Sequence, residues 1–160
     1  MAKFIITFLI FIFIGCEIKN NQIIRPEKFS FEIINFNTVS KTIVNEYISN
    51  SPDHEIMSNL IQYWFDNRIK INGYDGDLFL NVKKIEFNRE KKTDSYKFSV
   101  SLALEFVEEK SSNSTKIYNL NSNEYGEIIG NFSIKDQDNL DLNIMHQSLE
   151  NISLKLKEAI

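Results

Sequence analysis

A run of strictly alternating residues between positions 96 and 106 constrains the fold of this chain more than any other feature of its sequence. Every second side chain in the run is large and apolar, and the side chains between them are polar or small. The apolar set consists of Tyr96, Phe98, Val100, Leu102, Leu104 and Phe106. Alternation with a period of two is typical of a β-strand with one buried face. We therefore expect an antiparallel sheet that packs on one side only.

Two other segments have the periodicity of amphipathic helices. The first begins at Ser51, a candidate N-cap, continues through Pro52 in the first turn, and is expected to end at Gly73. The second covers about residues 140–159, with apolar side chains three and four positions apart. These side chains are Leu142, Met145, Leu149, Ile152 and Leu156. Both segments predict helices that pack one stripe against the sheet.

Shorter patterns predict the remaining strands. Residues 29–33 alternate, and the apolar face of residues 78–82 changes phase before Ile85, which predicts a β-bulge at Lys83–Lys84. Residues 111–114 form a hairpin loop, and residues 117–120 with 127–134 form either one bent strand or two short strands. The order of elements predicts an α+β fold, a two-layer sandwich of an antiparallel sheet of about four strands with two helices on one face. Residues 29–160 are expected to form a single domain.

The N-terminus has the pattern of a secretory signal. Lys3 precedes an apolar run over residues 4–14 that only Thr7 interrupts, and Gly15 and Cys16 follow directly. A membrane-spanning helix needs about 20 apolar residues. The polar stretch that starts at Glu17 begins too early for such a helix, so we expect residues 1–15 to be a cleaved signal peptide.

The position of Cys16 resembles the lipobox of bacterial lipoproteins, in which a small residue precedes the lipidated cysteine. The matching residues are 13–16, although Phe13 stands where the family usually has Leu. The resemblance implies a diacylglycerol on Cys16, a tether over residues 16–28, and an anchored position on the periplasmic side of the cell membrane or the outer membrane. Glu17 leaves the choice of membrane open. The alternative is a free cysteine within a signal peptide.

Composition excludes some functions. The net charge of −4 argues against binding of nucleic acid, which usually needs a strongly basic surface. Cys16 is the only cysteine, so no disulfide within the chain is expected.

Few residues suggest catalysis or metal binding. The two histidines are isolated: His54 is expected to be a capping or surface residue, and His146 a partly buried packing residue. The pair Glu108–Glu109 is expected in a solvated turn. The acidic segment 136–141 lacks the glycine and the terminal glutamate of a calcium loop, so it indicates a helix cap. We expect no enzyme activity, no metal and no cofactor.

Trp64 and Arg68 are the candidate partner-binding residues. They lie four positions apart on the first predicted helix, so the guanidinium could stack on the indole ring. The alternative places Trp64 in the core and pairs Arg68 with a carboxylate. A basic cluster could likewise meet lipid phosphates or form a solvated hairpin. It consists of Lys83, Lys84, Arg89, Lys91 and Lys92.

Residues 60–73 resemble a segment of a family of small alphaproteobacterial lipoproteins of uncharacterised activity. The resemblance rests on Trp64, Arg68, Gly73 and Gly76 and extends loosely over residues 30–160. A weaker similarity of architecture connects the chain with the lipopolysaccharide-assembly lipoprotein and with auxiliary lipoproteins of envelope ABC transporters. Fold alone does not define function.

These observations predict a membrane-anchored, non-enzymatic lipoprotein that binds an envelope protein partner, in lipopolysaccharide or lipid transport or assembly. A lipoprotein that binds a small apolar ligand is the first alternative. A small lipidated hydrolase is the second.

Overall fold

The computed structural model describes residues 32–44 and 51–160. Six strands and two helices follow one another along these residues. In chain order they are β1 (Ile34–Phe36), β2 (Ser40–Val44), α1 (Pro52–Arg68), β3 (Ile69–Ile71), β4 (Asp77–Lys91), β5 (Ser95–Glu109), β6 (Thr115–Ile129) and α2 (Ile134–Ala159). Residues 29–31 of the predicted first strand lie outside the described part, and the strand that is present, β1, begins at Ile34.

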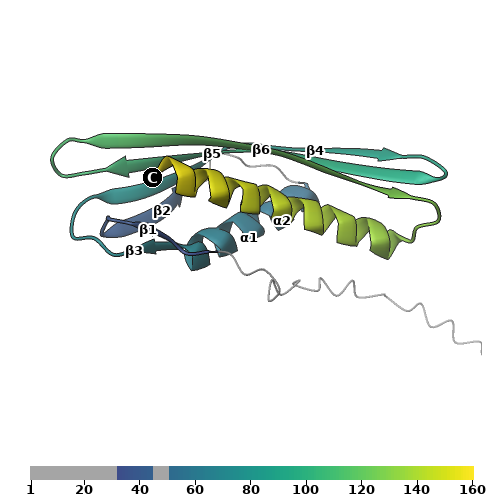
Figure 1. Ribbon diagram of the computed structural model, residues 1–160, viewed down its shortest axis with the longest axis horizontal. Coiled ribbons are helices and arrows are strands. Elements are labelled where there is room, and N and C mark those ends of the chain that lie inside the picture. The colour runs from purple at the N-terminus through teal and green to yellow at the C-terminus, as the bar shows by residue number, and fades with distance from the viewer. Residues whose placement is uncertain (1–31, 45–50) are drawn as a thin grey trace, which may run out of the picture.

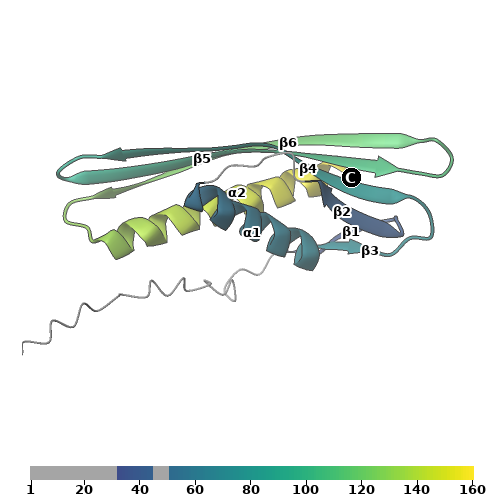
Figure 2. The ribbon, with the colours of Figure 1, turned by 180° about the vertical axis from the view of Figure 1, so that it is seen from behind.

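The main sheet has the strand order β2-β4-β5-β6. Strands β4, β5 and β6 are each 15 residues long and form an antiparallel meander. In β5 every second residue from Tyr96 to Glu108 is buried, which confirms the strand predicted over residues 96–106. Both helices lie on the same side of this sheet (Figures 1 and 2). The α+β fold with two helices on one face of the sheet is therefore confirmed.

The predicted sheet is mostly antiparallel, and two strand pairs of the fold are parallel. Strand β2 pairs in parallel with β4, and β1 pairs in parallel with β3 in a separate two-stranded sheet. In each pair α1 lies between the two strands in sequence. A helix that returns the chain in the same direction permits parallel pairing, whereas a short hairpin turn does not.

The predicted bulge in β4 is confirmed. The register with β5 shifts between Val82 and Lys84. Val82 and Ile85 are both buried, although they lie three positions apart. The extra residue rotates the strand, so the apolar side chains on both sides of the bulge face the helices.

Helix α1 ends earlier than predicted, at Arg68 instead of Gly73. Ile69 is already extended and pairs with Ile34 of β1. The amine of Lys41 donates to the carbonyl oxygens of Phe65 at 2.8 Å and Ile69 at 2.6 Å. These bonds satisfy carbonyl groups that the end of the helix leaves without an intrahelical partner.

Gly73 and Gly76 are required by the backbone that passes beside them. A Cβ atom on Gly73 would lie 2.3 Å from the carbonyl carbon of Asn37 and 2.5 Å from the nitrogen of Thr38. Gly76 has a φ of +83°, and a Cβ there would lie 2.1 Å from the carbonyl oxygen of Glu109. The turn into β4 can therefore pass between β1–β2 and the end of β5 only without side chains.

Helix α2 begins earlier than predicted, at Ile134 instead of about residue 140. Ser133 and Asp136 form a capping box, in which each side chain binds the backbone N–H of the other residue. This confirms that Asp136 belongs to a helix cap. The preceding strand, β6, is one continuous strand, and it stops at Ile129.

The core lies between the sheet and the two helices. Trp64 is 1% exposed, packs edge-on against Phe106 at 6.0 Å, and donates from Nε1 to the hydroxyl of Ser153 at 2.7 Å. Phe36 of β1 stacks on the opposite part of the core, 6.1 Å from the Phe106 ring centre. None of the helices within residues 32–44 and 51–160 combines the length and apolar character needed to cross a bilayer.

Candidate functional site

Cys16 lies outside the residues that the structure describes, as do the predicted signal peptide over residues 1–15 and most of the tether over residues 16–28. Lipid attachment at Cys16 therefore stays a prediction from the sequence. The described residues show the domain that such an anchor would hold.

Trp64 and Arg68 lie on α1, one turn apart, but only Arg68 is partly exposed. The indole ring of Trp64 is in the core, and its one polar atom is bonded to Ser153 of α2. A partner at the surface of α1 would therefore reach Arg68 without touching the indole ring. Burial of the arginine side chain lowers the pKa of Arg68. A role of this pair in partner binding stays a prediction.

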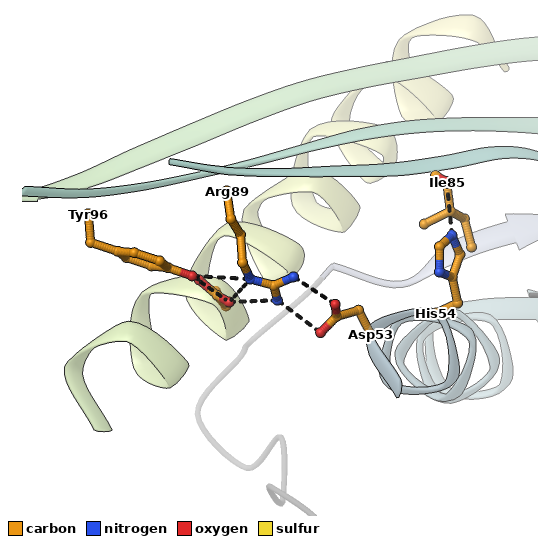
Figure 3. Close-up of polar contacts among 6 residues, drawn as sticks. Asp53, His54, Ile85, Arg89 and Tyr96 are labelled. Carbon is orange, nitrogen blue, oxygen red and sulfur yellow. Dashed lines mark hydrogen bonds and ion pairs between the residues drawn. The ribbon is translucent and has the colours of Figure 1, made fainter. Parts of the chain in front are cut away.

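A polar network around Arg89 joins four elements of the fold (Figure 3). The Arg89 guanidinium of β4 binds both carboxylate oxygens of Asp53 in the first turn of α1, at 2.6 and 2.8 Å. It also binds Oδ2 of Asp141 in α2, from Nε at 2.9 Å and from Nη2 at 2.8 Å. The Tyr96 hydroxyl of β5 donates to the Asp141 carboxylate at 2.8 Å, and the guanidinium packs 4.7 Å from the Phe98 ring centre.

The electrostatics of this network follow from its partial burial. The hydrogen bonds that the guanidinium donates to Asp53 and to Asp141 raise the pKa of Arg89. Burial raises the pKa of the Asp141 carboxyl, and the bonds from Arg89 and Tyr96 oppose this shift. Burial, followed by the hydrogen bond to Asp141, raises the pKa of Tyr96 to about 12.

The network is suited to hold the fold together and unsuited to catalysis. A general base or nucleophile needs an accessible atom whose pKa matches the reaction. Here the Arg89 side chain stays cationic, and the Asp141 carboxylate is bonded to both Arg89 and Tyr96. The arrangement fastens the start of α1 and the first half of α2 to the same end of the sheet (Figure 3).

The two histidines lie on α1 and α2, the helices that this network joins to the sheet. His54 is half-buried, packs edge-on against Phe87 at 5.0 Å, and its Nε2 lies 3.2 Å from the carbonyl oxygen of Ile85. The prediction of a capping or surface residue is therefore wrong for His54. His146 is 3% exposed, which is a deeper burial than predicted, and burial lowers its pKa.

Acidic residues form no metal site in the part of the chain that the structure describes, where no group of three histidine, cysteine or acidic side chains comes together. Glu108 is 6% exposed and pairs with Lys110 at 2.9 Å, so the prediction of a solvated turn is wrong for this residue. Its position on the buried face of β5 follows from the same alternation as Tyr96.

The predicted basic cluster is largely neutralised by neighbouring acids. Lys83 pairs with Glu105 at 3.0 Å, and Lys84 pairs with Glu86 at 2.8 Å. Arg89 is committed to the network described above. A surface whose cations already have partners attracts lipid phosphates less strongly, which favours the solvated hairpin.

The face of the main sheet turned away from the helices is open among the described residues (Figures 1 and 2). A row with three apolar residues crosses it, because the strand registers place Thr42, Phe79, Val107 and Ile117 side by side on four strands. Phe79 and Val107 are half-buried, and Ile117 is 56% exposed. No element of residues 32–44 or 51–160 covers this row (Figures 1 and 2).

Two depressions of the described surface are open to solvent. The larger, about 570 Å³, lies along β6 from Lys116 to Leu120 and is bounded by Ala159 and Ile160 at the end of α2. The smaller, about 300 Å³, lies at the turn around Gly76. Neither is an enclosed apolar cavity of the kind that usually holds a small apolar molecule.

Sequence reasoning missed the Arg89 network, although one signal of it was present. Asp141 lies four residues before Met145 on the stripe of α2 that packs against the sheet. An acidic residue on an apolar helix face is costly unless it is paired, so it predicts a buried cation nearby. The sequence could not show that this cation is Arg89.

Comparisons with known proteins found similar folds only at low sequence identity. No protein-family model matches the sequence, and no curated protein matches it. The minor lipoprotein of Acinetobacter baumannii has 10% identity and a TM-score of 0.43, over 80% of this chain and 92% of that one. The rare lipoprotein B of Shewanella oneidensis has 8% identity and a TM-score of 0.40, over 76% and 93%. A lipoprotein of Caulobacter crescentus CB15 has 6% identity and a TM-score of 0.40, over 74% and 85%.

These three structures are bacterial lipoproteins by name. At TM-scores below 0.5 the likeness supports no inference about function. The similarity to the alphaproteobacterial family stays a prediction.

Proposed function

We propose that this chain is a lipid-anchored accessory protein of the bacterial envelope that works without catalysis, by binding another envelope protein through the open face of its sheet. The anchor is Cys16, and the domain faces the periplasm from the cell membrane or the outer membrane. The similarity of architecture noted from the sequence makes proteins of lipopolysaccharide or lipid transport and assembly the first partners to look for.

The observation that supports the proposal is the apolar row on a sheet face whose neighbouring residue pairs are polar. Phe79 and Val107 occupy adjacent strands at its centre, and Ile117 extends the row to the edge. The next residue pairs along the sheet are polar or charged, as at Asn81–Glu105. An apolar strip that is rimmed by polar groups is typical of a protein-binding surface.

The described residues favour neither alternative function. The interior contains large, fully buried side chains such as Trp64, Phe65, Phe98 and Phe106, and the two depressions described above are both open to solvent. A hydrolase would need an accessible nucleophile with an adjacent base. His146, the more buried histidine, is on the core side of α2.

Mass spectrometry of the mature N-terminus tests the anchor. We expect the wild-type protein from membranes to begin at Cys16 and to carry the mass of attached acyl chains, because lipid is attached through a thioether to the Cys16 sulfur and cleavage removes residues 1–15. The Cys16→Ser variant should carry no acyl mass and should leave the membrane fraction under mild washing. A wild-type protein that retains residues 1–15 without acyl mass would contradict the proposal.

Site-specific photo-crosslinking in intact cells tests the binding face. A photoreactive residue at Val107 should form a defined adduct with one envelope protein, because Val107 lies at the centre of the apolar row. The matched position is Ile134, which is 74% exposed but lies at the start of α2. A Phe79→Lys substitution should abolish the adduct at Val107. Equal adducts at both positions, or none at Val107, would argue against this face.

A further inference from the structure

Strand β6 forms one edge of the main sheet and pairs only with β5 among the described strands. Backbone hydrogen bonds join Lys110 to Ser114 at one end of this hairpin and Gly130 to Asp94 at the other. Antiparallel strands bond at every second residue, so the even-numbered residues of β6 bond to β5. The odd-numbered residues from 115 to 129 therefore direct their N–H and C=O groups away from the sheet. The contact of the Lys155 amine with the Asn121 carbonyl oxygen, at 2.7 Å, agrees with this direction.

This edge has charged side chains, Lys116, Glu124 and Glu127, but lacks several other devices that keep strands from pairing. Proteins blunt exposed edges with charged side chains, prolines, bulges, very short strands or a covering element. β6 is 15 residues long, contains no proline, and keeps one register with β5 throughout. By contrast, the opposite edge strand β2 has five residues, and α1 approaches the edge of β4 beyond it, where His54 contacts the Ile85 carbonyl oxygen.

The side chains of β6 are arranged so that the strand complements itself in the antiparallel direction. Its first half contains Lys116 and no acid, and its second half contains Glu124 and Glu127 and no base. Of the three large exposed apolar side chains of β6, Ile117 at 56% and Tyr125 at 81% lie at equal distances along the strand on either side of position 121, and Ile129 lies at its end. Parallel pairing would place like charges together, whereas antiparallel pairing brings opposite charges together.

We infer that β6 pairs antiparallel with β6 of a second copy of this chain, about a twofold axis at Asn121, so that the two sheets become one. In this register Ile117 lies opposite Tyr125 of the second copy, and Asn119 lies opposite Asn123. Lys116 lies diagonally across from Glu124 on the helix side of the joined sheet. The odd-numbered backbone groups from residue 115 to residue 127 then all find partners.

The surface beside β6 leaves room for this second strand. The depression of about 570 Å³ follows the strand from Lys116 to Leu120, beside the end of α2. Lys155 does not block the pairing, because the carbonyl oxygen of Asn121 has two lone pairs and can accept a second bond. The surface involved differs from the apolar row proposed to bind another protein, and the inference does not depend on the lipid at Cys16.

Disulfide trapping in the cell envelope tests the register. Residues that form a hydrogen-bonded antiparallel pair have Cα atoms about 5.5 Å apart, which a disulfide can bridge. The Asn121→Cys variant should therefore give a covalent dimer of the full chain on a non-reducing gel after mild oxidation. Asn123→Cys is the matched control, since its two copies would lie about 14 Å apart along the strands. The wild-type chain, with Cys16 alone, sets the baseline.

A covalent dimer of Asn121→Cys above that baseline, and its absence for Asn123→Cys, would support the inference. Equal dimer formation by the two variants would overturn the register, and an Asn121→Cys adduct with a different protein would overturn self-pairing. These outcomes are independent of whether Cys16 carries lipid. A disulfide dimer of the wild-type chain would show that the Cys16 thiol is free, which would contradict lipidation. The Asn121→Cys and Asn123→Cys variants would then be compared in a chain that also carries Cys16→Ser.

Light scattering of the detergent-solubilised full chain provides a second test. Asn121→Pro removes an outward N–H group, which leaves the bonds between β6 and β5 intact. We expect this variant to have the mass of one chain, and wild type and Asn121→Ala to have the mass of two. The fluorescence of Trp64, the single tryptophan, reports whether each variant is folded. A wild type with the mass of one chain, or an Asn121→Pro variant with the mass of two, would overturn the inference.

Discussion

At the scale of single residues, Arg89 shows how one charged side chain can connect distant parts of a small fold. Its guanidinium reaches Asp53 at the start of α1 and Asp141 in α2, and its side chain also packs on Phe98. The planar group donates to both carboxylate oxygens of Asp53 and, from Nε and Nη2, to one oxygen of Asp141, an arrangement that a lysine could not make. Tyr96 completes the arrangement by donating to Asp141.

Loss of Arg89 should destabilise the domain. In Arg89→Ala the Asp141 side chain, which is 11% exposed, loses its cation and becomes an uncompensated buried charge. Because the Arg89 side chain is itself 36% exposed, we expect a decrease of about 2–3 kcal/mol in the free energy of unfolding. Urea denaturation followed by Trp64 fluorescence measures it. The control Lys84→Ala removes an exposed pair and should cost less than about 0.5 kcal/mol. Equal effects would contradict a structural role of the network.

His146 should make the stability depend on pH. Burial lowers its pKa in the folded state below the ordinary value of 6.5, so the unfolded chain binds a proton that the folded chain does not. The contribution to stability is therefore complete above pH 6.5 and is lost as the pH falls through the interval between 6.5 and the lowered value. Over that interval we expect a slope of up to about 1.4 kcal/mol per pH unit.

Urea denaturation of wild type and His146→Leu at several pH values isolates this effect. The leucine variant, of similar size and without a titrating ring, should lack the part of the slope that His146 contributes. Identical pH profiles for the two proteins would show that His146 does not titrate differently in the folded state.

At the scale of elements, the helices and the long strands followed local patterns, whereas the short strands did not. The alternation in β5 and the phase change in β4 were sufficient to predict a one-sided sheet and its bulge. Strands β1 and β3 have only three residues each, which is too short for a period to be recognised. They form because Ile34 pairs with Ile69, and that pairing depends on where α1 places the chain that follows it.

The end of α1 shows the same influence of contacts between distant residues. The sequence from Ile69 to Gly73 continues without a local stop signal before the glycine, so a helix to Gly73 was expected. In the structure, pairing of Ile69 with β1 and the bonds from Lys41 to the helix carbonyl groups end the helix at Arg68. Tertiary contacts therefore override the local preference.

Gly73→Ala should weaken the contact between these elements. The added Cβ would lie 2.3 Å from the Asn37 backbone, and the backbone cannot move aside without disturbing the pairing of β1 with β3. We expect a loss of about 1–3 kcal/mol in the free energy of unfolding, measured by urea denaturation. Asn72→Ala, at the neighbouring exposed position, should change it by less than about 0.5 kcal/mol. A neutral Gly73→Ala would mean that the turn can shift at little cost.

At the scale of the whole molecule, the two-layer architecture leaves one face and one edge of the sheet without a covering element among the described residues (Figure 1). A strand edge as long as β6 tends to pair with another strand. Self-association through that edge would make stability depend on protein concentration.

Thermal unfolding at several concentrations therefore checks the assembly. We expect the unfolding midpoint of the full chain to rise with protein concentration, because association stabilises the folded state by mass action. In Asn121→Pro, whose outward N–H is missing, the midpoint should be independent of concentration. A wild-type midpoint that stays constant over the same range would argue against the joined sheet.

The candidate site was predictable only in part. The basic cluster around Lys83 and Lys84 was visible in the sequence, but its acidic partners Glu105 and Glu86 became apparent only from strand register and side-chain packing. Trp64 and Arg68 were correctly placed on one helix, yet helical spacing could not show which of the two faces the core. Which side chains of two different elements come into contact depends on how those elements pack against each other. A single sequence does not show that packing.

The sequence by itself determined the α+β class, because the period-two alternation of residues 96–106 and the helical stripes leave few ways to bury their apolar faces. It also carries the prediction of a lipid anchor, since a lone Cys16 at the end of an apolar run depends on chain order alone. Only the tertiary structure decided which strands run parallel, which charge meets Asp141, and that β6 is an edge. Those features arise from contacts between residues far apart in the chain, and such contacts leave no period in the sequence.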